Sequence, residues 1–519
     1  MKFSLWLLAV SVPLSTALPL GLKQYFFNLL VDIRSSDPFP VDPTFSDNVN
    51  KTTLDSWLAD EYDVAWNNLL RNIGNSSTCL DPNIFPGVIV ASPSKVKPDY
   101  YYQWTRDSSL TIRTLIHYLQ DSVNKSDSDP RFQEYQWLVE NYIWNNFHLQ
   151  RLPTMSGDFD SGNTLGEPKY LVNNSQFNQN WGRPQNDGPG LRISSILSFV
   201  SLELPSQTGL NTTFIFNEII KPDLLFVANN WMKESFDLWE EIKSLHFFTS
   251  SVQLKGLLDG IQFINSNSYL NVDQEVVDTL VTNYKDLKKF IESYYISTKT
   301  NYVLESPALF PHTRSGLDSA VLLGAIHSHD MNENDKLIPF DIDSNHILNH
   351  LVKIAGDMKS RYPINHHLDF SNAVGIGRYP EDVYDGYGTS EGNPWFISTA
   401  TAAELLYKFA YKLVTAKEDL IITAANKDFF KLVLQLDDTQ DFVVIKYKSA
   451  VFNDLIENLL KFSDNFLVVV KDHVDLKGGV SEQFNKYHGF MEGARDLTWS
   501  YSSLLNAFRW RGKVMKLVT

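Results

Sequence analysis

Carboxylates stand next to tryptophan, tyrosine and arginine in several segments of this sequence. The two clearest are Phe236-Asp-Leu-Trp-Glu-Glu241 and Ser481-Glu-Gln-Phe484. Aromatic ring faces stack on the C–H side of neutral sugars, while arginine and carboxylate side chains bond to the hydroxyl groups. Hydrolysis of a glycosidic bond needs two carboxyl groups, one that protonates the leaving oxygen and one that acts on the opposite side of the ring. Glu240 or Glu241, together with Glu482, is therefore the candidate pair.

Each of these acidic segments also has a simpler structural interpretation. Asp237-Leu-Trp-Glu240 fits a capping box at the start of a helix. Asp107 and Asp187 fit N-cap positions. Arg106 and Arg378 also fit a purely structural role as ion-pair partners, and Trp181 and Trp395 fit a role as core residues. For each residue taken singly, the sequence leaves both interpretations open. Their joint placement on one set of loops favours a functional site.

Metal and cofactor chemistry is weakly supported. The sequence has no His-Glu-x-x-His, and Gly375-Ile-Gly377 lacks the third glycine of a dinucleotide-binding loop. Asp341-Ile-Asp343 begins like a calcium loop but lacks the glycine and the glutamate that such a loop needs. The single cysteine, Cys79, excludes an intramolecular disulfide. We expect no cofactor and no metal.

The composition excludes several classes of protein. The chain has 519 residues, with 45 lysines and arginines against 61 aspartates and glutamates, for a net charge of −16. This balance argues against nucleic acid and against an anionic membrane surface, because both would repel the protein. Hydrophobic residues make up 43% and aromatic residues 13%, which excludes intrinsic disorder because a large core can form. We expect a monomer.

Helical periodicity dominates the chain from residue 53 onward. Between 272 and 295, for example, Leu280, Leu287 and Ile291 fall on one helix face. Similar patterns predict twelve helices, over 53–73, 107–121, 130–151, 188–204, 214–233, 243–260, 272–295, 315–329, 344–361, 395–414, 450–473 and 497–508. Strand signals are few, and Phe442 to Tyr447 predicts a small hairpin within 415–449.

The connections that follow the odd-numbered predicted helices hold the unusual polar and aromatic residues. Consecutive helices that alternate in direction place all of these connections at one end. Polar and aromatic residues gathered at one end of a rigid scaffold indicate a functional face. The pattern therefore predicts a toroid of helical hairpins with its site at one end.

Several of these loops resemble the signature loops of fungal glucoamylases of the yeast type, in glycoside hydrolase family 15. The matching segments are YYYQWTRDS, WGRPQNDGP, FDLWEE, GRYPEDVYDGYG, EGNPW, SEQF and RDLTWSY, in the family's order from about residue 53 to the C-terminus. The resemblance implies an all-α fold, an (α/α)6 barrel of twelve helices with irregular loops. It also implies an exo-acting α-glucosidase that releases β-D-glucose with inversion. Its substrates would be the non-reducing ends of starch, glycogen and maltooligosaccharides, with mainly α-1,4 and slower α-1,6 cleavage.

The same resemblance implies a role for each matching residue. Glu240 matches the general acid, Glu482 the general base, and Asp237 an alternative, less favoured base. Substrate-binding positions are implied at Trp181, Arg106, Asp107, Glu241, Arg378, Tyr100, Trp104, Trp395 and Trp499. An inverting enzyme leaves room for water between its carboxyl groups, so we expect Glu240 and Glu482 to be about 6.5–9.5 Å apart, against about 5 Å in a retaining enzyme.

The N-terminal residues predict a secretory route. Lys2, the apolar stretch from Phe3 to Leu14 and the small residues up to Ala17 fit a signal peptide over 1–17. An irregular arm is expected over 18–50 and a catalytic domain over 51–519, with no C-terminal starch-binding domain. We expect a secreted, extracellular glycoprotein, with vacuolar or cell-wall retention as the alternative. The five predicted glycosylation sites are Asn50, Asn75, Asn124, Asn173 and Asn211.

Two other functions fit the same pattern less well. One is another (α/α)6 glycosidase, trehalase-like or dextran-directed, and the other is a non-catalytic protein that binds α-glucan. A non-catalytic protein would be expected to lose one of the two carboxylates, yet Glu240 and Glu482 are both present. Trehalose tested beside maltose discriminates between the enzymes.

Overall fold

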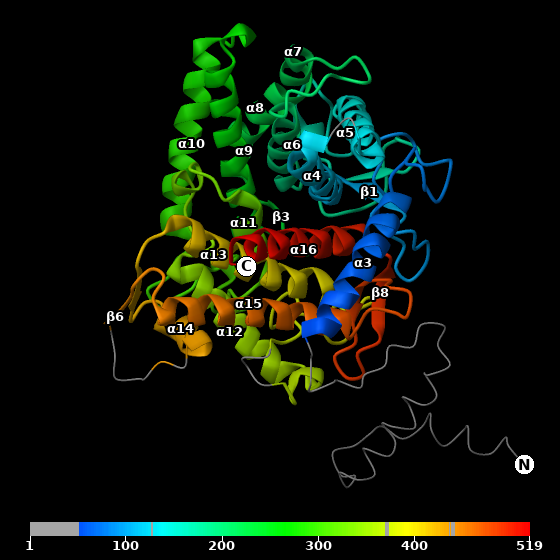
Figure 1. The fold of residues 1–519 in the computed structure, drawn as a ribbon. Helices are drawn as coiled ribbons and strands as arrows, with labels where there is room; N and C mark the ends of the chain where they lie inside the picture. The colour runs from blue at the N-terminus through cyan, green and yellow to red at the C-terminus, as the bar shows by residue number, and fades with distance from the viewer. Residues whose placement is uncertain (1–50, 126–127, 369–372, 435, 437–441, 519) are drawn as a thin grey trace, which may run out of the picture.

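The computed structural model describes residues 51–125, 128–368, 373–434, 436 and 442–518 (Figure 1). The predicted signal peptide, the arm over 18–50 and the sequon at Asn50 lie outside these residues. No helix in the described part is long and apolar enough to cross a membrane.

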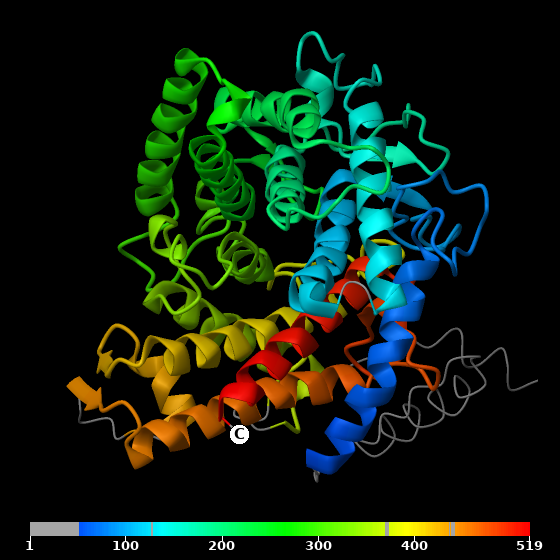
Figure 2. The ribbon, with the colours of Figure 1, turned by 45° about the horizontal axis from the view of Figure 1, so that its top comes forward.

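Six helices form a closed inner ring in which each packs on the next and the last packs on the first. They are α4 (Thr105–Ser122), α6 (Asp187–Val200), α9 (Phe247–Ser266), α11 (Ser319–Ser328), α13 (Phe396–Ala416) and α16 (Thr498–Val518). Figure 2 shows α16, in red, passing beside α13 and α3. A closed ring of helices is the inner layer of an (α/α)6 barrel.

Six further helices cover this ring from outside, each packing on one or more inner helices. They are α3 (Lys51–Arg71), α5 (Pro130–Leu149), α8 (Lys221–Asn230), α10 (Gln274–Tyr294), α12 (Asn345–Arg361) and α15 (Ala450–Lys471). Outer and inner helices alternate along the chain, so the described residues have the predicted all-α (α/α)6 architecture.

Burial explains why the two layers have different sequences. The outer helix α10 buries one face, with Leu280, Leu287 and Ile291 as its fully covered side chains, which is the stripe that its periodicity predicts. The inner helix α11 is buried almost throughout, and its small residues let neighbouring helices approach it. A helix that is apolar all round belongs in the interior.

The predicted helices all occur, with differences in detail. The helix expected over 497–508 continues to Val518 as α16. The helix expected from residue 243 begins at Phe247, because the residues before it form a hairpin. The helix expected over 214–233 is divided into α7 (Thr212–Ile215), a π-helical turn at Phe216–Ile220 and α8. A further short helix, α14 (Lys427–Leu434), lies in the 415–449 insertion and was not predicted.

The described strands form four small antiparallel pairs. They are β1 (Tyr102–Trp104) with β2 (Lys169–Leu171), β3 (Ser235–Phe236) with β4 (Lys243–Ser244), β5 (Leu420–Thr423) with β6 (Phe442–Ile445), and β7 (Ser481–Phe484) with β8 (Met491–Arg495). The β5–β6 pair confirms the strand predicted from Phe442 and an antiparallel strand pair within 415–449, but α14 lies between the two strands, so they do not form a simple hairpin. The other three pairs were not predicted.

The six inner helices all run in the same direction. Residues at the N-terminal ends of α4, α13 and α16 line one cavity, at Arg106, Ile397 and Trp499. The C-terminal halves of all six helices line a second cavity, through His117, Ser198, Gln262, His327, Lys408 and Lys513. The barrel therefore has an end with helix N-termini and an end with helix C-termini.

Close packing of α6 on α9 gives a first prediction. A Cβ atom on Gly190 would lie 2.7 Å from the carbonyl oxygen of Val252, whereas one on Gly512 in α16 would meet no atom within 4 Å. We expect Gly190→Ala to lower the free energy of unfolding by about 1–3 kcal/mol through overpacking. Gly512→Ala, the matched helical control, should raise it by up to about 1 kcal/mol. Thermal unfolding midpoints that move in the same direction for both variants would contradict this packing.

Candidate active site

A cavity of about 240 Å³ lies at the end with the helix N-termini. Two of the three predicted catalytic residues and all nine predicted substrate-binding residues line it: Glu240, Glu482, Trp181, Arg106, Asp107, Glu241, Arg378, Tyr100, Trp104, Trp395 and Trp499. We call it the catalytic cavity. Drug-sized ligands occupy cavities of about 300–1,000 Å³, so this smaller cavity is suited to one sugar residue at a time.

Glu240 lies on the turn that joins β3 to β4 and not in the first turn of a helix. The capping-box interpretation of Asp237-Leu-Trp-Glu240 is therefore wrong. The backbone of Glu240 has a φ of 65°, a left-handed conformation that non-glycine residues seldom adopt. Such strained positions are concentrated at active sites, where the surrounding structure holds them in place.

One carboxylate oxygen of Glu240 accepts several hydrogen bonds. The indole Nε1 of Trp104 donates to Oε1 at 2.7 Å, the amide of Gln185 donates to it at 2.8 Å, and Arg106 Nη2 lies 3.5 Å away. Within the described part of the chain, Oε2 has no hydrogen-bond partner. Because three donors face Oε1, a proton on this carboxyl group belongs on Oε2.

Glu482 lies in β7, at the point where the β7–β8 pairing shifts register between Ser481 and Gln483. Such a bulge re-aims a side chain and is common beside active sites. Gly493 on β8, with a φ of 73°, lies against this carboxylate, and a Cβ atom there would be 2.3 Å from Oε2 of Glu482. The hairpin therefore needs glycine opposite the glutamate.

The surroundings of Glu482 favour an unusual acidity. Its side chain is 1% exposed, and burial raises its pKa to about 7, while Arg378, Tyr100 and Tyr384 oppose this rise. The hydroxyl of Tyr384 donates to Oε2 at 3.2 Å and lies 3.0 Å from the hydroxyl of Tyr100. Tyr384 belongs to the GRYPEDVYDGYG segment, but sequence reasoning did not select it.

Arg106 is held by several carboxylates on one side of the catalytic cavity. It is 4% exposed, with Nη1 2.9 Å from Asp187 and Nε 3.6 Å from Asp107. Asp107 lies in the first turn of α4 and Asp187 begins α6, but neither is the N-cap residue. The N-cap interpretation is wrong for both. Burial raises the pKa of Asp107 to about 6. This carboxyl group can therefore either accept a hydrogen bond from a sugar hydroxyl or donate one to it.

Arg378 is held in the same way on another side. Its guanidinium pairs with Asp382 at 2.6 Å and with Glu241 at 2.7 Å, and Tyr379 donates to the second oxygen of Glu241. Burial alone would raise the pKa of Glu241, but Arg378 and Tyr379 outweigh it and lower the pKa. Glu241 therefore stays ionised, which suits substrate binding and not proton donation.

Asp237 is the one predicted catalytic residue that does not line the catalytic cavity. It is 6% exposed, and one of its oxygens accepts from the backbone amides of Glu241 and Ile242 at 2.7 and 2.8 Å. Asp237 therefore fixes the turn that carries Glu240, and its position argues against the alternative role as base.

The aromatic walls leave hydrogen-bond donors for a ligand. The indole Nε1 atoms of Trp181 and Trp395 are buried and have no partner in the described part of the chain. Trp239, which sequence reasoning missed, packs edge-on against Trp395 with ring centroids 5.2 Å apart and donates to Asp318 at 2.9 Å. Unpaired indole donors beside ring faces match the needs of a bound sugar.

Lys169 is a further residue that the sequence did not indicate. Its side chain is 2% exposed, and Nζ lies 3.5 Å from the ring centroid of Trp181 and 4.3 Å from that of Trp104. The rings of Tyr102 and Phe177 complete the cage at 4.1 and 4.5 Å. Desolvation lowers the pKa of Lys169 to about 8. Cation–π attraction fixes the two tryptophans next to Glu240.

The remaining predictions concern surface and metal sites. Of the five sequons, Asn75, Asn124, Asn173 and Asn211 have exposed side chains, as a glycosylation site requires, and their glycosylation stays a prediction. Among the described residues, no cluster of three or more His, Cys, Asp or Glu side chains is arranged to hold a metal ion.

Comparison with known proteins decides the family. The profile of the glycosyl hydrolases family 15 matches residues 63–509. The chain belongs to this family. It is 39% identical to glucoamylase GLU1 of Saccharomycopsis fibuligera, over 90% of this chain and 92% of that protein. It is 36% identical to the intracellular sporulation-specific glucoamylase of Saccharomyces cerevisiae, over 90% of this chain and 86% of that one.

Solved structures of the family have the same fold. The glucoamylase from Saccharomycopsis fibuligera superimposes with a TM-score of 0.83 at 38% identity, covering 93% of this chain and 98% of that one. The family 15 glucoamylase from Hypocrea jecorina gives a TM-score of 0.78 at 30% identity, with 90% and 75% covered. The (α/α)6 barrel expected from the loop motifs is thereby confirmed.

The hydrogen bond from Tyr384 to Glu482 predicts a change in pH dependence. Tyr384→Phe removes a donor that favours the carboxylate, so the pKa of Glu482 should rise further. The predicted role of Glu482 as general base requires its deprotonated form, so the acid-side limb of the kcat/KM profile should move to higher pH by about one unit. Tyr387→Phe, an exposed tyrosine on the same loop, is the control. Superimposable acid limbs for Tyr384→Phe and wild type would contradict the assignment.

Proposed function

We propose that this family 15 protein is a glucoamylase, a glucan 1,4-α-glucosidase that removes glucose from the non-reducing ends of starch-type chains. Glu240 and Glu482 are far apart in sequence but line the same small cavity, and this observation carries the proposal. Two arginines, each held by carboxylates, and several aromatic side chains complete the cavity wall. The family membership and the names of the relatives support the same activity.

The contacts of the two glutamates support a division of roles. Glu240 gives the proton on Oε2 to the glycosidic oxygen as the bond from that oxygen to C1 breaks. A water molecule forms the new bond to C1 from the opposite face, and Glu482 accepts its proton. The sugar that keeps C1 is released with its anomeric configuration inverted, which is the stereochemistry expected of two carboxyl groups separated by a water.

The remaining groups position the sugar. Asp107 and Arg106 can bond to hydroxyl groups at one side of the catalytic cavity, and Arg378 and Glu241 can do so at another. Both arginines are fixed by buried carboxylates, Asp187 and Asp382, so little side-chain entropy is lost on binding. A cavity suited to one sugar residue supports removal of single glucose units from a chain end.

Secretion and glycosylation are part of the proposal. The sequon at Asn211, like the three others in the described residues, presents an exposed asparagine, and the first seventeen residues have the pattern of a signal peptide. One relative is named as an intracellular enzyme, so retention inside the cell is the competing location. Secretion would be tested by assaying the culture medium and the cell lysate for the protein.

Replacement of the proposed base tests the catalytic assignment. We expect Glu482→Gln to lower kcat on maltotriose by about 10²–10⁴-fold, the range for loss of a general base, while maltose binding is retained. Glu391→Gln is the matched control, because Glu391 pairs with Lys486 outside the catalytic cavity. Turnover and binding can be measured by glucose release and by calorimetry.

Two results would count against the proposal. An unchanged kcat in Glu482→Gln would remove this residue from the mechanism. Wild-type protein that cleaves trehalose and leaves maltose intact would show that the site serves a different (α/α)6 glycosidase activity.

A further inference from the structure

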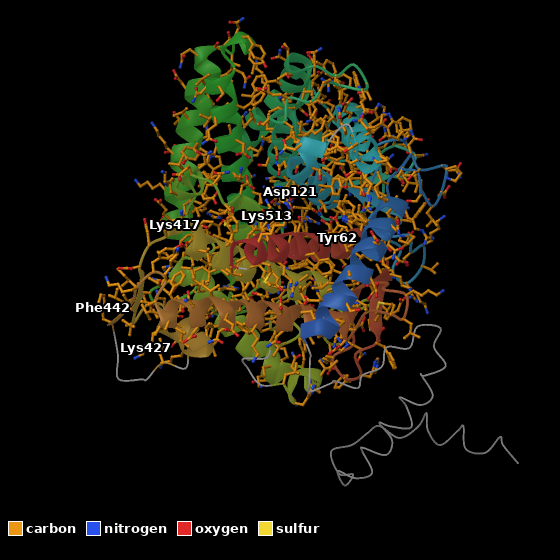
Figure 3. The ribbon with its side chains drawn as sticks, viewed as in Figure 1. Tyr62, Asp121, Lys417, Lys427, Phe442 and Lys513 are labelled. Atoms are coloured by element: carbon orange, nitrogen blue, oxygen red, sulfur yellow. The ribbon has the colours of Figure 1, made fainter. Side chains whose placement is uncertain are left out.

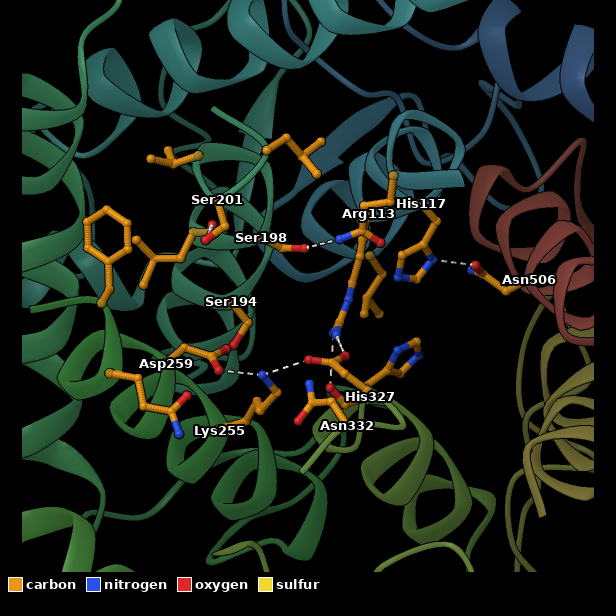
Figure 4. A pocket seen from close by; sticks show the side chains of 18 of the residues that line it. Arg113, His117, Ser194, Ser198, Ser201, Lys255, Asp259, His327, Asn332 and Asn506 are labelled. Carbon is orange, nitrogen blue, oxygen red and sulfur yellow. Dashed lines mark hydrogen bonds and ion pairs between the residues drawn. The ribbon is translucent and has the colours of Figure 1, made fainter. Parts of the chain in front are cut away.

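The C-terminal halves of the six inner helices surround a second cavity, which we call the far cavity (Figure 4). It has a volume of about 930 Å³ and shares no lining residue with the catalytic cavity. Its inner wall includes Arg113 and Lys408, each 4% exposed, and its rim includes the exposed Glu203 and Tyr269. The space therefore extends from solvent into the barrel.

The charges around the far cavity are nearly balanced. Five lysines and arginines line it together with four aspartates and glutamates. Lys408 Nζ donates to the carbonyl oxygen of Ile326 at 2.7 Å and Arg113 donates to that of His327 at 2.9 Å, so these cations offset the partial negative charge of a helix C-terminus. Lys513 pairs with Asp121 at 3.1 Å (Figure 3). No excess of charge remains to recruit a small ion.

The two histidines of the far cavity do not alter this balance. Burial lowers the pKa of His117 and of His327 well below the ordinary value, so both rings are neutral. His117 Nδ1 lies 2.9 Å from Asn506 Oδ1, and Lys255 pairs with Asp330 at 2.8 Å (Figure 4). The far cavity thus presents neutral rings and internally paired charges.

Three buried nitrogen atoms of the far cavity have no partner in the described part of the chain: Arg113 Nε, Trp510 Nε1 and His327 Nε2. The first two can only donate hydrogen bonds. Buried donors normally have an acceptor, and these two have none within the described part of the chain, so an occupant with oxygen acceptors that reaches them would satisfy them. The occupant should therefore carry several oxygen atoms.

The aromatic side chains of the far cavity narrow the class of occupant. Phe263 and Trp510 belong to its wall, and Tyr269, 56% exposed, stands at its rim. Ring faces, carboxylate–cation pairs and free indole and guanidinium donors occur together here as they do in the catalytic cavity. The far cavity differs in that its charges are nearly balanced, whereas four carboxylates and two arginines line the catalytic cavity. That combination fits a neutral molecule with many hydroxyl groups.

We propose that the far cavity is a second, non-catalytic binding site for a neutral saccharide. Two sources can supply it. One is a free maltooligosaccharide, a choice that rests on the proposed function. The other is a sugar chain attached to this protein, because the sequon residue Asn211 is exposed and its neighbour Thr212 lines the far cavity.

The test counts binding sites on a protein that cannot consume the ligand. Glu482→Gln, produced in a host that does not attach N-linked glycans, is titrated with maltotriose by calorimetry. We expect two sites per chain. Adding Gln262→Trp, which fills the rim of the far cavity, should remove one of them. Gln274→Trp, the same exchange on an exposed residue of the outer helix α10, should leave two.

A second arm identifies the source of the saccharide. Glu482→Gln from a glycosylating host should also show two sites if the far cavity takes free maltotriose. One site that returns to two on Asn211→Gln would show that the attached glycan occupies the far cavity, which supports the proposal with the other source.

Two outcomes separate this inference from the proposed function. Two results together would overturn the saccharide site in the far cavity and leave the proposed function untouched. The first is a single maltotriose site that Gln262→Trp does not change. The second is an Asn211 glycan that an endoglycosidase removes equally fast from Gln262→Trp and Gln274→Trp. The absence of any maltotriose binding would contradict the proposed function as well. In the active background, Gln262→Trp should hydrolyse maltotriose at the wild-type rate, which shows that the fold is intact.

Discussion

The six inner helices all run in the same direction, and this determines at which end of the barrel the functional groups gather. Helix N-termini present unpaired amide groups and partial positive charge, and C-termini present the opposite. Because all six helices begin at one end of the barrel, the loops that enter them bring Trp104, Asp318 and Trp395 to that end as N-cap residues. The acidic and aromatic loops are the ones that enter the inner helices, so they lie at the end with the helix N-termini and form the site there.

A second consequence is that the charged groups of the site are buried in matched pairs. Arg106 with Asp187 and Arg378 with Asp382 are almost fully covered, and removal of either partner would strand a buried charge, which is strongly destabilising. These pairs are rigid, so they hold the cavity walls in place around Glu240 and Glu482. At the other end, lysines and arginines offset the helix C-termini, which leaves a polar and neutral space.

The helices could be predicted from the sequence because the outer ones bury a single face and therefore repeat every 3.6 residues. The barrel end that carries the site followed from the alternation of plain and unusual connections. The β3–β4 and β7–β8 hairpins that carry the two glutamates could not be predicted, since strands of two to five residues are too short to show a period. Their geometry decides the site, however: the left-handed turn at Glu240 and the bulge at Glu482 exist only in the folded chain.

The hardest residues to predict were those whose roles depend on contacts with residues far away in sequence. Lys169 and Tyr384 gain their roles from aromatic rings and a carboxylate far away in sequence, so no local pattern marks them. Asp237 shows the reverse case, since its neighbourhood suggested a catalytic carboxylate while its hydrogen bonds hold a turn. Motif position indicated the right segment, and only the packing separated the residues that face the cavity from those that support it.

We propose that Glu240 and Glu482 act from opposite sides of one sugar with a water between them. The most direct measurement is proton NMR of maltoheptaose hydrolysis during the first turnovers, before the anomers equilibrate. We expect β-glucose as the first product, with maltohexaose as its partner. Initial release of α-glucose, or of maltose or larger fragments, would contradict it.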